Sequence, residues 1–328
     1  MKVCILSDTH LSSQKYSKMD HNLGMNRFMV RQFETMEWIV NYLKENDVKT
    51  IVHGGDMFDS SRVTVYPIER TKKLLKDFDV YAIKGNHDDS NFLHDNEMSA
   101  LSLLDINCFN KPGAVDIGGT NFVFIPWGYN IDLNLIEKNK KNVLVAHGYP
   151  RPYTPGTKVN NKTDVGGMLS NRTEKFDLVI TGHYHSIDGF VRGKTHYLNP
   201  GSISATANDS GNDPSIWILD TETLKYDRAK IPCAVKLIRE TPKDVNNYLD
   251  NITEENIYRL SVVDRNVVNR KTLIKARKIA LDIQFKQIIV EDKNDNKSNK
   301  FIDPFWDYVN KNSSYTEDFK KVISELEC

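Results

Sequence analysis

Short apolar runs recur through the first 181 residues of this chain, and they limit its fold more than any other feature. The six runs are Val3–Leu6, Thr50–Val52, Val80–Ile83, Phe122–Ile125, Val143–Ala146 and Leu178–Thr181. Runs of this length and composition are typical of buried strands. Between the first two, apolar residues repeat at spacings of four and three, as on the buried face of a helix: Met29, Phe33, Met36, Val40 and Leu43. Strands that alternate with such helices predict an α/β sheet.

Five polar motifs occur in order, and each follows an apolar run immediately. They are Asp8-Thr9-His10, Gly55-Asp56, Gly85-Asn86-His87-Asp88, Ala146-His147-Gly148 and Gly182-His183-Tyr184-His185. Ligands of α/β sheets gather beyond the carboxyl ends of the strands, so these side chains are expected to converge. A single motif of this kind is more often a plain turn or a helix cap. The ordered set of five predicts a metal site.

The ligand types in these motifs are carboxylate, imidazole and amide, without thiolate, which suits manganese, iron or zinc. The predicted ligands are Asp8, His10, Asp56, Asn86, His147, His183 and His185. Seven groups are too many for one ion, so we expect two divalent ions, preferably Mn²⁺, with Asp56 as the bridging carboxylate. Such a pair lowers the pKa of a water or hydroxide between the ions, which permits attack on phosphorus near neutral pH.

His87 stands beside Asn86 in the same turn and is expected to face the site without binding the same ion. Its imidazole is a candidate to protonate the leaving oxygen or to stabilise charge on the phosphoryl group. Asp59 is expected to orient it. His53, at a strand end, is interpreted as a packing residue or a support of the site. The remaining histidines lack a motif and are expected on the surface or in the core: His21, His94 and His196.

From residue 231 the pattern changes to that of a small α+β domain. We expect a strand from Ile231 to Ile238, a helix opened by Thr241-Pro242, a strand at Ile257–Val263, a helix from Asn269 and a strand at Gln287–Val290. Residues 291–300 are almost wholly polar and predict a linker. Residues 301–328 predict a pair of short, aromatic-rich helices, which bind a partner or dock on their own domain.

The composition excludes several classes of protein. The 44 basic and 44 acidic residues balance, so any contact with a polyanion must come from a local patch or a partner. One candidate patch, either a DNA contact or a solvated helix face, is Arg265, Arg270, Lys271, Lys275, Arg277 and Lys278. Four widely spaced cysteines argue against a zinc ribbon or a disulfide framework and favour the cytoplasm. No apolar run is long enough for a signal peptide or a membrane span.

Together the motifs resemble the signature of the calcineurin-like metallophosphoesterases over about residues 1–220. Within that superfamily the chain looks most like the SbcD-type nuclease subunits of double-strand-break repair complexes, in their bacterial and phage form. The segments that support the resemblance are Ile5 to Leu11, Gly55 to Asp59, Gly85 to Asp88 and Tyr197 to Ser202. The resemblance implies a β-sandwich flanked by helices.

The resemblance also implies the rest of the architecture and the role of each site residue. It implies a nuclease domain at 1–230, a capping domain at 231–290, a linker at 291–300 and partner-binding helices at 301–328. By position, one metal would be held by Asp8, His10, Asp56 and His185, and the other by Asp56, Asn86, His147 and His183. His87 would be the catalytic histidine. Asp59 falls where archaeal and eukaryotic relatives tend to have histidine, so the chain resembles the bacterial and phage form at this position.

The leading hypothesis is therefore a DNA exonuclease and endonuclease subunit, working in the cytoplasm, or in the host cytoplasm if the chain comes from a phage. The resemblance implies an SbcC-like coiled-coil ATPase as partner, and a homodimer. The alternatives are a stand-alone small-molecule phosphodiesterase or phosphatase of the same superfamily, and a non-catalytic scaffold.

Overall fold

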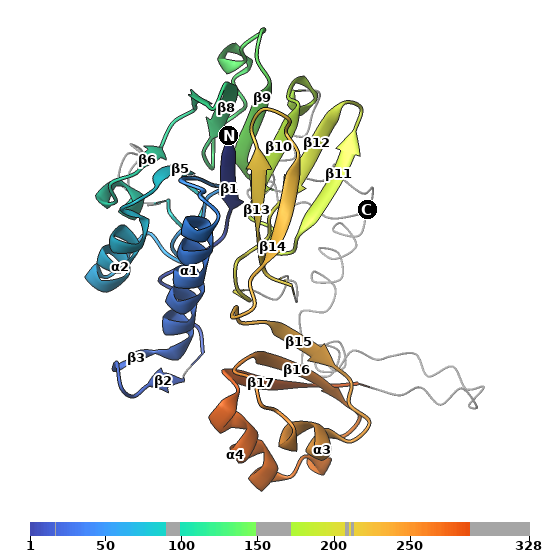
Figure 1. Ribbon diagram of the computed structural model, residues 1–328. Helices are drawn as coiled ribbons and strands as arrows, with labels where there is room; N and C mark the ends of the chain where they lie inside the picture. The colour runs from blue at the N-terminus through green and yellow to red at the C-terminus, as the bar shows by residue number, and fades with distance from the viewer. Residues whose placement is uncertain (17, 90–98, 149–171, 207–209, 211–212, 289–328) are drawn as a thin grey trace, which may run out of the picture. The chain divides into compact units, whose positions relative to one another are not determined.

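The computed structural model describes residues 1–288 except 17, 90–98, 149–171, 207–209 and 211–212. The chain divides into two compact units, Met1–Gln287 and Ile288–Cys328. All described helices and strands belong to the first unit (Figure 1). The predicted linker, the predicted C-terminal helices and His94 lie outside the described residues. No described helix is long and apolar enough to cross a membrane.

Two six-stranded sheets form the main body of the first unit. The first has the order β14-β13-β1-β4-β5-β6. Its strands are β1 (Lys2–Leu6), β4 (Thr50–His53), β5 (Asp79–Ile83), β6 (Asn107–Phe109), β13 (Ser215–Asp220) and β14 (Tyr226–Lys230). Strands β1, β4, β5 and β6 run parallel, whereas β13 is antiparallel to its neighbours β1 and β14.

The second sheet has the order β11-β12-β10-β9-β8-β7. Its strands are β7 (Gly113–Ile117), β8 (Thr120–Ile125), β9 (Asn142–His147), β10 (Leu178–Gly182), β11 (Asp188–Arg192) and β12 (Thr195–Asn199). Strands β8, β9, β10 and β12 are parallel, and an antiparallel strand closes each edge. All six strands that the sequence predicts are confirmed, as β1, β4, β5, β8, β9 and β10.

The alternation of side chains along β1 explains how the two sheets and the helices pack. Val3 and Ile5 point into a core shared with Phe122, Val143 and other residues of the second sheet. The residues between and after them point to the opposite face, because successive side chains of a strand alternate. That face is covered by α1 (Arg27–Glu45) and α2 (Val65–Leu75), beside β4 and β5 in Figure 1. The predicted sandwich flanked by helices is confirmed.

The predicted buried face of α1 is also confirmed. Met29, Phe33, Met36, Val40 and Leu43 are each at most 5% exposed. The helix begins after Asn26, whose side chain accepts hydrogen bonds from the main-chain N–H groups of Phe28 and Met29. A short hairpin of β2 (Met19–Asp20) and β3 (Met25–Asn26) precedes it.

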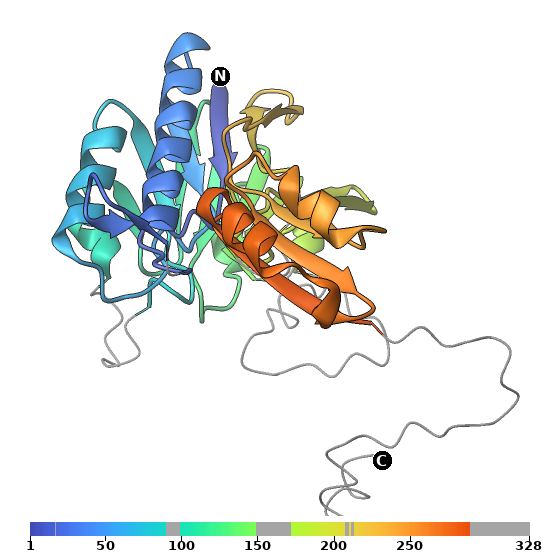
Figure 2. The same cartoon turned by 90° about the horizontal axis from the view of Figure 1, so that it is seen from below.

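Residues 237–287 form a smaller module with its own three-stranded parallel sheet, in the order β15-β16-β17 (Figure 2). Its elements are β15 (Leu237–Glu240), α3 (Val245–Asp250), β16 (Ile257–Val262), α4 (Arg270–Ile279) and β17 (Asp282–Gln287). A separate apolar core includes Leu249, Tyr258, Leu260 and Ile283. The predicted order of strands and helices in this module is confirmed.

Three of the predicted boundaries in this module are wrong. The first strand begins only at Leu237, since residues 232–234 form a turn. The first helix begins after Asp244, not at Pro242, because the Asp244 carboxylate caps the N–H groups of Asn246 and Asn247. The last strand begins at Asp282, five residues before the predicted start. The predicted start of α4 is confirmed, since Asn269 caps it.

Ionic and apolar contacts hold this module within the first unit. Glu255 accepts two hydrogen bonds of 3.0 and 2.8 Å from the Arg27 side chain at the start of α1. The Lys18 ammonium donates to the main-chain carbonyls of Lys278 and Ile279 at the end of α4, where cations are favoured. An apolar cluster joins the same regions and includes Phe28, Ala205, Val235, Leu237, Ile257 and Leu281.

Candidate metal centre

The loops that follow β1, β4, β5, β9 and β10 meet at one edge of the sandwich. Main-chain pairing continues past the strand ends, since Asp8 N donates to Gly55 O (3.0 Å) and His10 N donates to Asp56 O (3.1 Å). In the second sheet, Gly182 lies opposite His147 in the parallel register. The carboxyl ends of parallel strands therefore bring all five motifs together, as the sequence predicts.

One group of candidate ligands consists of Asp8, His10 and His185, whose ligand atoms all lie within 4.8 Å of one another. The Nε2 atoms of His10 and His185 are 3.2 Å apart. His185 Nε2 lies 3.8 Å from Asp8 Oδ1. The Asp8 carboxylate also accepts a hydrogen bond from His183 N, at 3.0 Å. This bond fixes the carboxylate to the loop that contains His183 and His185.

A second group consists of Asp56, His147 and His183. His147 Nε2 is 3.3 Å from Asp56 Oδ2, and the amide oxygen of Asn86 is 3.1 Å from His147 Nε2 and 2.8 Å from His183 Nδ1. Asp56 Oδ2 is also 3.9 Å from His10 Nε2, in the first group. A third group consists of His10, Asp56 and His87, so Asp56 belongs to two of the three groups and His87 also offers a nitrogen atom at the site.

The donor atoms of these groups fit divalent metal ions. They are imidazole nitrogens and carboxylate oxygens, and two imidazole nitrogens face each other at 3.2 Å in the first group. His, Asp and Asn donors without sulfur suit first-row transition metals. All seven predicted ligands take part in these contacts. Their assignment to particular ions stays a prediction.

Backbone strain is concentrated at the same residues. Asp8, His10, Asp56 and His183 have φ values of 52°, 46°, 55° and 87°, in the left-handed region that non-glycine residues rarely adopt. Strained conformations of this kind cost about 1–3 kcal/mol each and persist where the surrounding structure imposes them. Four of the seven predicted ligands thus have strained backbone conformations, which no local sequence pattern indicates.

The charges of Asp56 and His147 stabilise each other. Burial raises the pKa of Asp56, but the neighbouring His147 outweighs this and holds that pKa below its usual range. Burial lowers the pKa of His147, but the charge of Asp56 outweighs this and raises the pKa to about 9. Burial and the charge on His147 lower the pKa of His183 to about 4. Asp56 is therefore ionised, and His147 has to release its proton when it binds a metal ion.

His87 and Asp59 both lie at the site, but they are joined through a main-chain atom. His87 Nδ1 is 2.8 Å from the main-chain carbonyl of Asp59, so this nitrogen donates and Nε2 is left as the other ring position. The Asp59 carboxylate lies instead 3.0 Å from His10 Nδ1 and 3.8 Å from Lys15 Nζ. Asp59 contacts the predicted catalytic histidine with its carbonyl and a predicted metal ligand with its side chain.

Asp88 is a buried support of the site that we did not predict from the sequence. Its carboxylate accepts hydrogen bonds from the main-chain N–H groups of Met57 (3.3 Å), Phe58 (3.1 Å) and Gly85 (3.0 Å). It therefore holds the Asp56 loop against the Asn86 loop. Burial and the charge of Asp56 raise the pKa of Asp88 to about 6. Its place at the end of the Gly85–Asp88 motif is a signal that could have indicated this role.

Trp127 is a second residue that sequence reasoning missed. Its indole stacks on the His183 ring, with centroids 5.3 Å apart, and meets the His147 ring edge-on at 6.0 Å. Its main-chain N–H donates to Lys84 O, one residue before the Gly85–Asp88 motif. It follows β8 at the same sheet edge as the other site residues, but a single aromatic residue without a motif gives no functional signal.

His53 contacts the loops that follow β1 and β4. It is 2% exposed, and its Nδ1 accepts a hydrogen bond from Gly55 N. Its Nε2 therefore donates to Thr9 Oγ1 (3.1 Å), which in turn donates to Met57 O (3.0 Å). Burial lowers the pKa of His53 to about 3, so the ring stays neutral. These contacts agree with a supporting role, whereas His21 and His196 are exposed.

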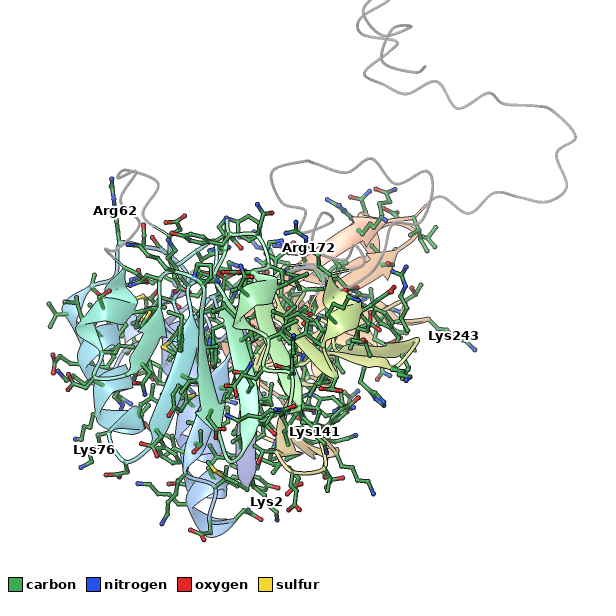
Figure 3. All side chains as sticks on the ribbon, turned by 90° about the horizontal axis from the view of Figure 1, so that it is seen from above. Lys2, Arg62, Lys76, Lys141, Arg172 and Lys243 are labelled. Atoms are coloured by element: carbon green, nitrogen blue, oxygen red, sulfur yellow. The ribbon has the colours of Figure 1, made fainter. Side chains whose placement is uncertain are left out.

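Cationic side chains are spread over the surface. Figure 3 shows Lys76, Lys141 and Lys243 at widely separated places. The exposed basic residues of α4 are Arg270, Lys271, Lys275, Arg277 and Lys278, and their contact with DNA stays a prediction.

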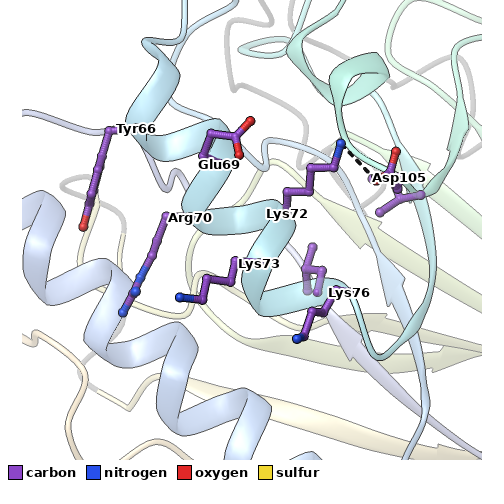
Figure 4. A pocket seen from close by; sticks show the side chains of 9 residues that line it. Tyr66, Glu69, Arg70, Lys72, Lys73, Lys76 and Asp105 are labelled. Carbon is purple, nitrogen blue, oxygen red and sulfur yellow. Dashed lines mark ion pairs between the residues drawn. The ribbon is translucent and has the colours of Figure 1, made fainter.

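A cavity of about 620 Å³ lies along α2 (Figure 4). None of the seven predicted ligands lines it, and its Lys72 side chain pairs with Asp105. It is separate from the metal centre.

Comparison with known proteins identifies the superfamily of the chain. A profile of the Calcineurin-like phosphoesterase superfamily domain matches residues 1–224. Exonuclease subunit 1 of Enterobacteria phage T4 is 24% identical over 242 residues, which cover 68% of this chain and 66% of that protein. The DNA double-strand break repair protein Mre11 of Methanosarcina acetivorans is 25% identical over 261 residues, which cover 71% of this chain and 39% of that protein. The chain thus spans less than two thirds of either relative.

A solved structure of an archaeal phosphodiesterase aligns with 70% of this chain and 99% of its own, with a TM-score of 0.40 and 19% sequence identity.

Proposed function

The chain belongs to the calcineurin-like phosphoesterase superfamily, and from this premise we propose that it is a DNA nuclease subunit that hydrolyses phosphodiester bonds with two divalent metal ions. One observation supports this most directly. The carboxylate of Asp56 lies between two groups of ligand atoms, 3.3 Å from His147 Nε2 and 3.9 Å from His10 Nε2. A shared carboxylate is the usual device by which proteins hold two ions side by side.

Asp8, His10 and His185 would hold one ion, and Asn86, His147 and His183 would hold the other. Asp56, which belongs to two of the groups of possible ligands, would be shared by both ions. The ions, when bound, polarise the phosphoryl oxygens and lower the pKa of a water molecule, and the imidazole-rich donor set favours Mn²⁺ over Mg²⁺.

The remaining side chains orient groups and move protons. His87 keeps its proton at Nδ1 through the Asp59 carbonyl, so its Nε2 faces the reacting group. In its protonated form this ring gives the Nε2 proton to the leaving oxygen, or stabilises charge on the phosphoryl group. The Asp59 carboxylate orients the His10 ring from its Nδ1 side, as carboxylates often do for histidine ligands. Asp88 keeps the Asp56 and Asn86 loops together.

The choice of DNA rests on the relatives, a phage exonuclease subunit and a DNA double-strand break repair protein. The module at residues 237–287 adds support, because a stand-alone enzyme for small phosphoesters needs no such addition.

We further propose that residues 301–328 bind an SbcC-like coiled-coil ATPase and that the chain acts as a homodimer inside the cell. If deletion of residues 301–328 leaves co-purification with such an ATPase intact, the assignment of the partner-binding segment is wrong.

The test compares two substrates with one metal. Purified protein with Mn²⁺ should cleave a DNA oligonucleotide as well as bis(p-nitrophenyl) phosphate, and Asp56→Ala should abolish both activities. Asp105→Ala is the matched control, because this carboxylate is exposed and, among the described residues, pairs with the Lys72 side chain alone, so both activities should persist. Cleavage of bis(p-nitrophenyl) phosphate without any cleavage of DNA would favour the small-molecule phosphodiesterase. Full activity of Asp56→Ala would refute the metal site.

A further inference from the structure

A second cavity, of about 290 Å³, lies directly beside the metal centre. It is lined by the predicted ligand His185 together with Ser202, Pro214 and Arg228. The sheet register explains this position. Strand β13 is antiparallel to β1, so its first residues lie next to the end of β1, and Ser7, just before Asp8, pairs with Ser202. The cavity therefore opens at the same sheet edge as the metal ligands.

Arg228 enters this cavity in a fixed conformation. Its Nε donates to Ser215 Oγ (2.8 Å) and its Nη2 donates to the main-chain carbonyl of Asp213 (2.6 Å). The guanidinium also lies over the Trp217 ring, 6.0 Å from the ring centroid. A side chain that is already ordered loses little conformational entropy when it binds a ligand. These contacts make Arg228 a preorganised cation rather than a mobile surface arginine.

The charged side chains that line the cavity, apart from His185, are Arg228 and Asp213, among the residues that the structure describes. Lys230 is not part of the lining, but it also pairs with Asp213, so this carboxylate is shared between Arg228 (2.8 Å) and Lys230 (3.2 Å). Burial raises the pKa of Asp213, but Lys230 and Arg228 outweigh this and lower it, so the carboxylate is ionised. Because Asp213 is shared with a second cation, it does not fully neutralise Arg228, which favours a negatively charged ligand. A guanidinium in particular matches the oxygens of a phosphate group.

We propose that this cavity binds the phosphate of a nucleotide adjacent to the scissile one, with Arg228 as the phosphate-binding residue. The proposal rests on the proposed nuclease function and makes it more specific, since it defines the substrate as a polynucleotide. Each strand of a nucleic acid carries one phosphate per about 3.4 Å of helix axis. A strand bound at the metal centre therefore presents further phosphates to its immediate surroundings. A small phosphoester has one phosphate, and when this phosphate is at the metal centre, the molecule offers none to the cavity.

The experiment compares Arg228→Gln with a matched arginine variant on two substrates. Arg192→Gln is the control, since Arg192 also forms an ion pair, with Glu174 at 3.0 Å. It lies at the end of β11 opposite Thr195, at the sheet edge away from the metal ligands. For wild type and both variants, kcat/KM is measured in Mn²⁺ for a single-stranded oligonucleotide and for bis(p-nitrophenyl) phosphate. The salt dependence of oligonucleotide binding is measured as well.

Arg228→Gln should lower the ratio of the two kcat/KM values, oligonucleotide over small diester, about tenfold, mainly through KM. The slope of log affinity against log salt should fall by about 1. Arg192→Gln should leave both quantities at the wild-type values. An unchanged ratio in Arg228→Gln, or equal losses on both substrates, would overturn the proposal. Failure of the wild type to cleave oligonucleotides at all would instead refute the nuclease function itself.

Discussion

Replacement of Gly85 by alanine should damage the site through a single steric contact. A Cβ atom at this position would lie 2.1 Å from Asp56 Oδ1 and 2.4 Å from Asp56 N, closer than real Cβ contacts allow. The φ angle of Gly85 is not positive, so alanine is compatible with the backbone and the effect is one of space alone. The Asp56 carboxylate and its loop must therefore move by about 1 Å, a displacement that costs roughly 100-fold in rate at a catalytic site.

The assay measures metal content, turnover of bis(p-nitrophenyl) phosphate in Mn²⁺ and the free energy of unfolding. Gly85→Ala should lower turnover at least about 100-fold and destabilise the fold by about 1–3 kcal/mol, as overpacked sites do. Gly189→Ala on β11 is the control, because the one described atom within 4 Å of its Cβ would be Tyr197 O, at an ordinary 3.4 Å. Wild-type turnover and metal content in Gly85→Ala would refute the tight packing of Gly85 against the proposed bridging carboxylate.

Three further variants test other parts of the site and the fold. His87→Ala should keep its metal content by elemental analysis but lose about 100- to 10,000-fold in turnover; loss of metal would make His87 a ligand. Trp127→Leu should weaken Mn²⁺ binding about tenfold, and Trp127→Phe should restore most of it in calorimetric titrations; equal affinities would exclude a role for the stacked ring. Burial raises the pKa of Glu255, but Arg27 and Lys18 outweigh this and lower it below 4.5. The free energy of unfolding of Glu255→Gln should therefore be about 1–3 kcal/mol lower than that of the wild type at pH 7. This difference should disappear as the pH falls below 4.5. A difference that persists in acid would show that charge is not its cause.

The strands and the ligand motifs were predictable because short runs of neighbouring residues determine both. An apolar run followed directly by Asp8 or by His147 combines a strand signal with a polar group at its carboxyl end. Parallel pairing then brings such ends to one edge without any further information. The buried face of α1 was predictable for a similar reason, since its spacing of four and three is a local property.

Features that depend on contacts between distant segments were not predictable. The stacking of Trp127 on His183 requires the loops after β8 and β10 to meet, and no residue near Trp127 indicates it. The sequence indicated Asp59, but not that its carbonyl contacts His87 while its carboxylate contacts His10. The first helix of the small module begins after Asp244 and not at the predicted Thr241-Pro242, because Asp244 caps it. Thr241 and Asp244 are both residue types that cap helices, so the sequence alone does not distinguish the two starts.

The central claim is that Asp56 joins two metal ions, and electron paramagnetic resonance of the Mn²⁺-loaded protein tests it most directly. At two equivalents of Mn²⁺ per chain, the wild type should give the spectrum of a spin-coupled pair, because a shared carboxylate holds the ions about 3.5–4 Å apart. Asp56→Ala should lose this spectrum, whereas Asp105→Ala should keep it. A wild-type protein that binds a single ion, or two ions with the spectra of isolated Mn²⁺, would contradict the two-metal site.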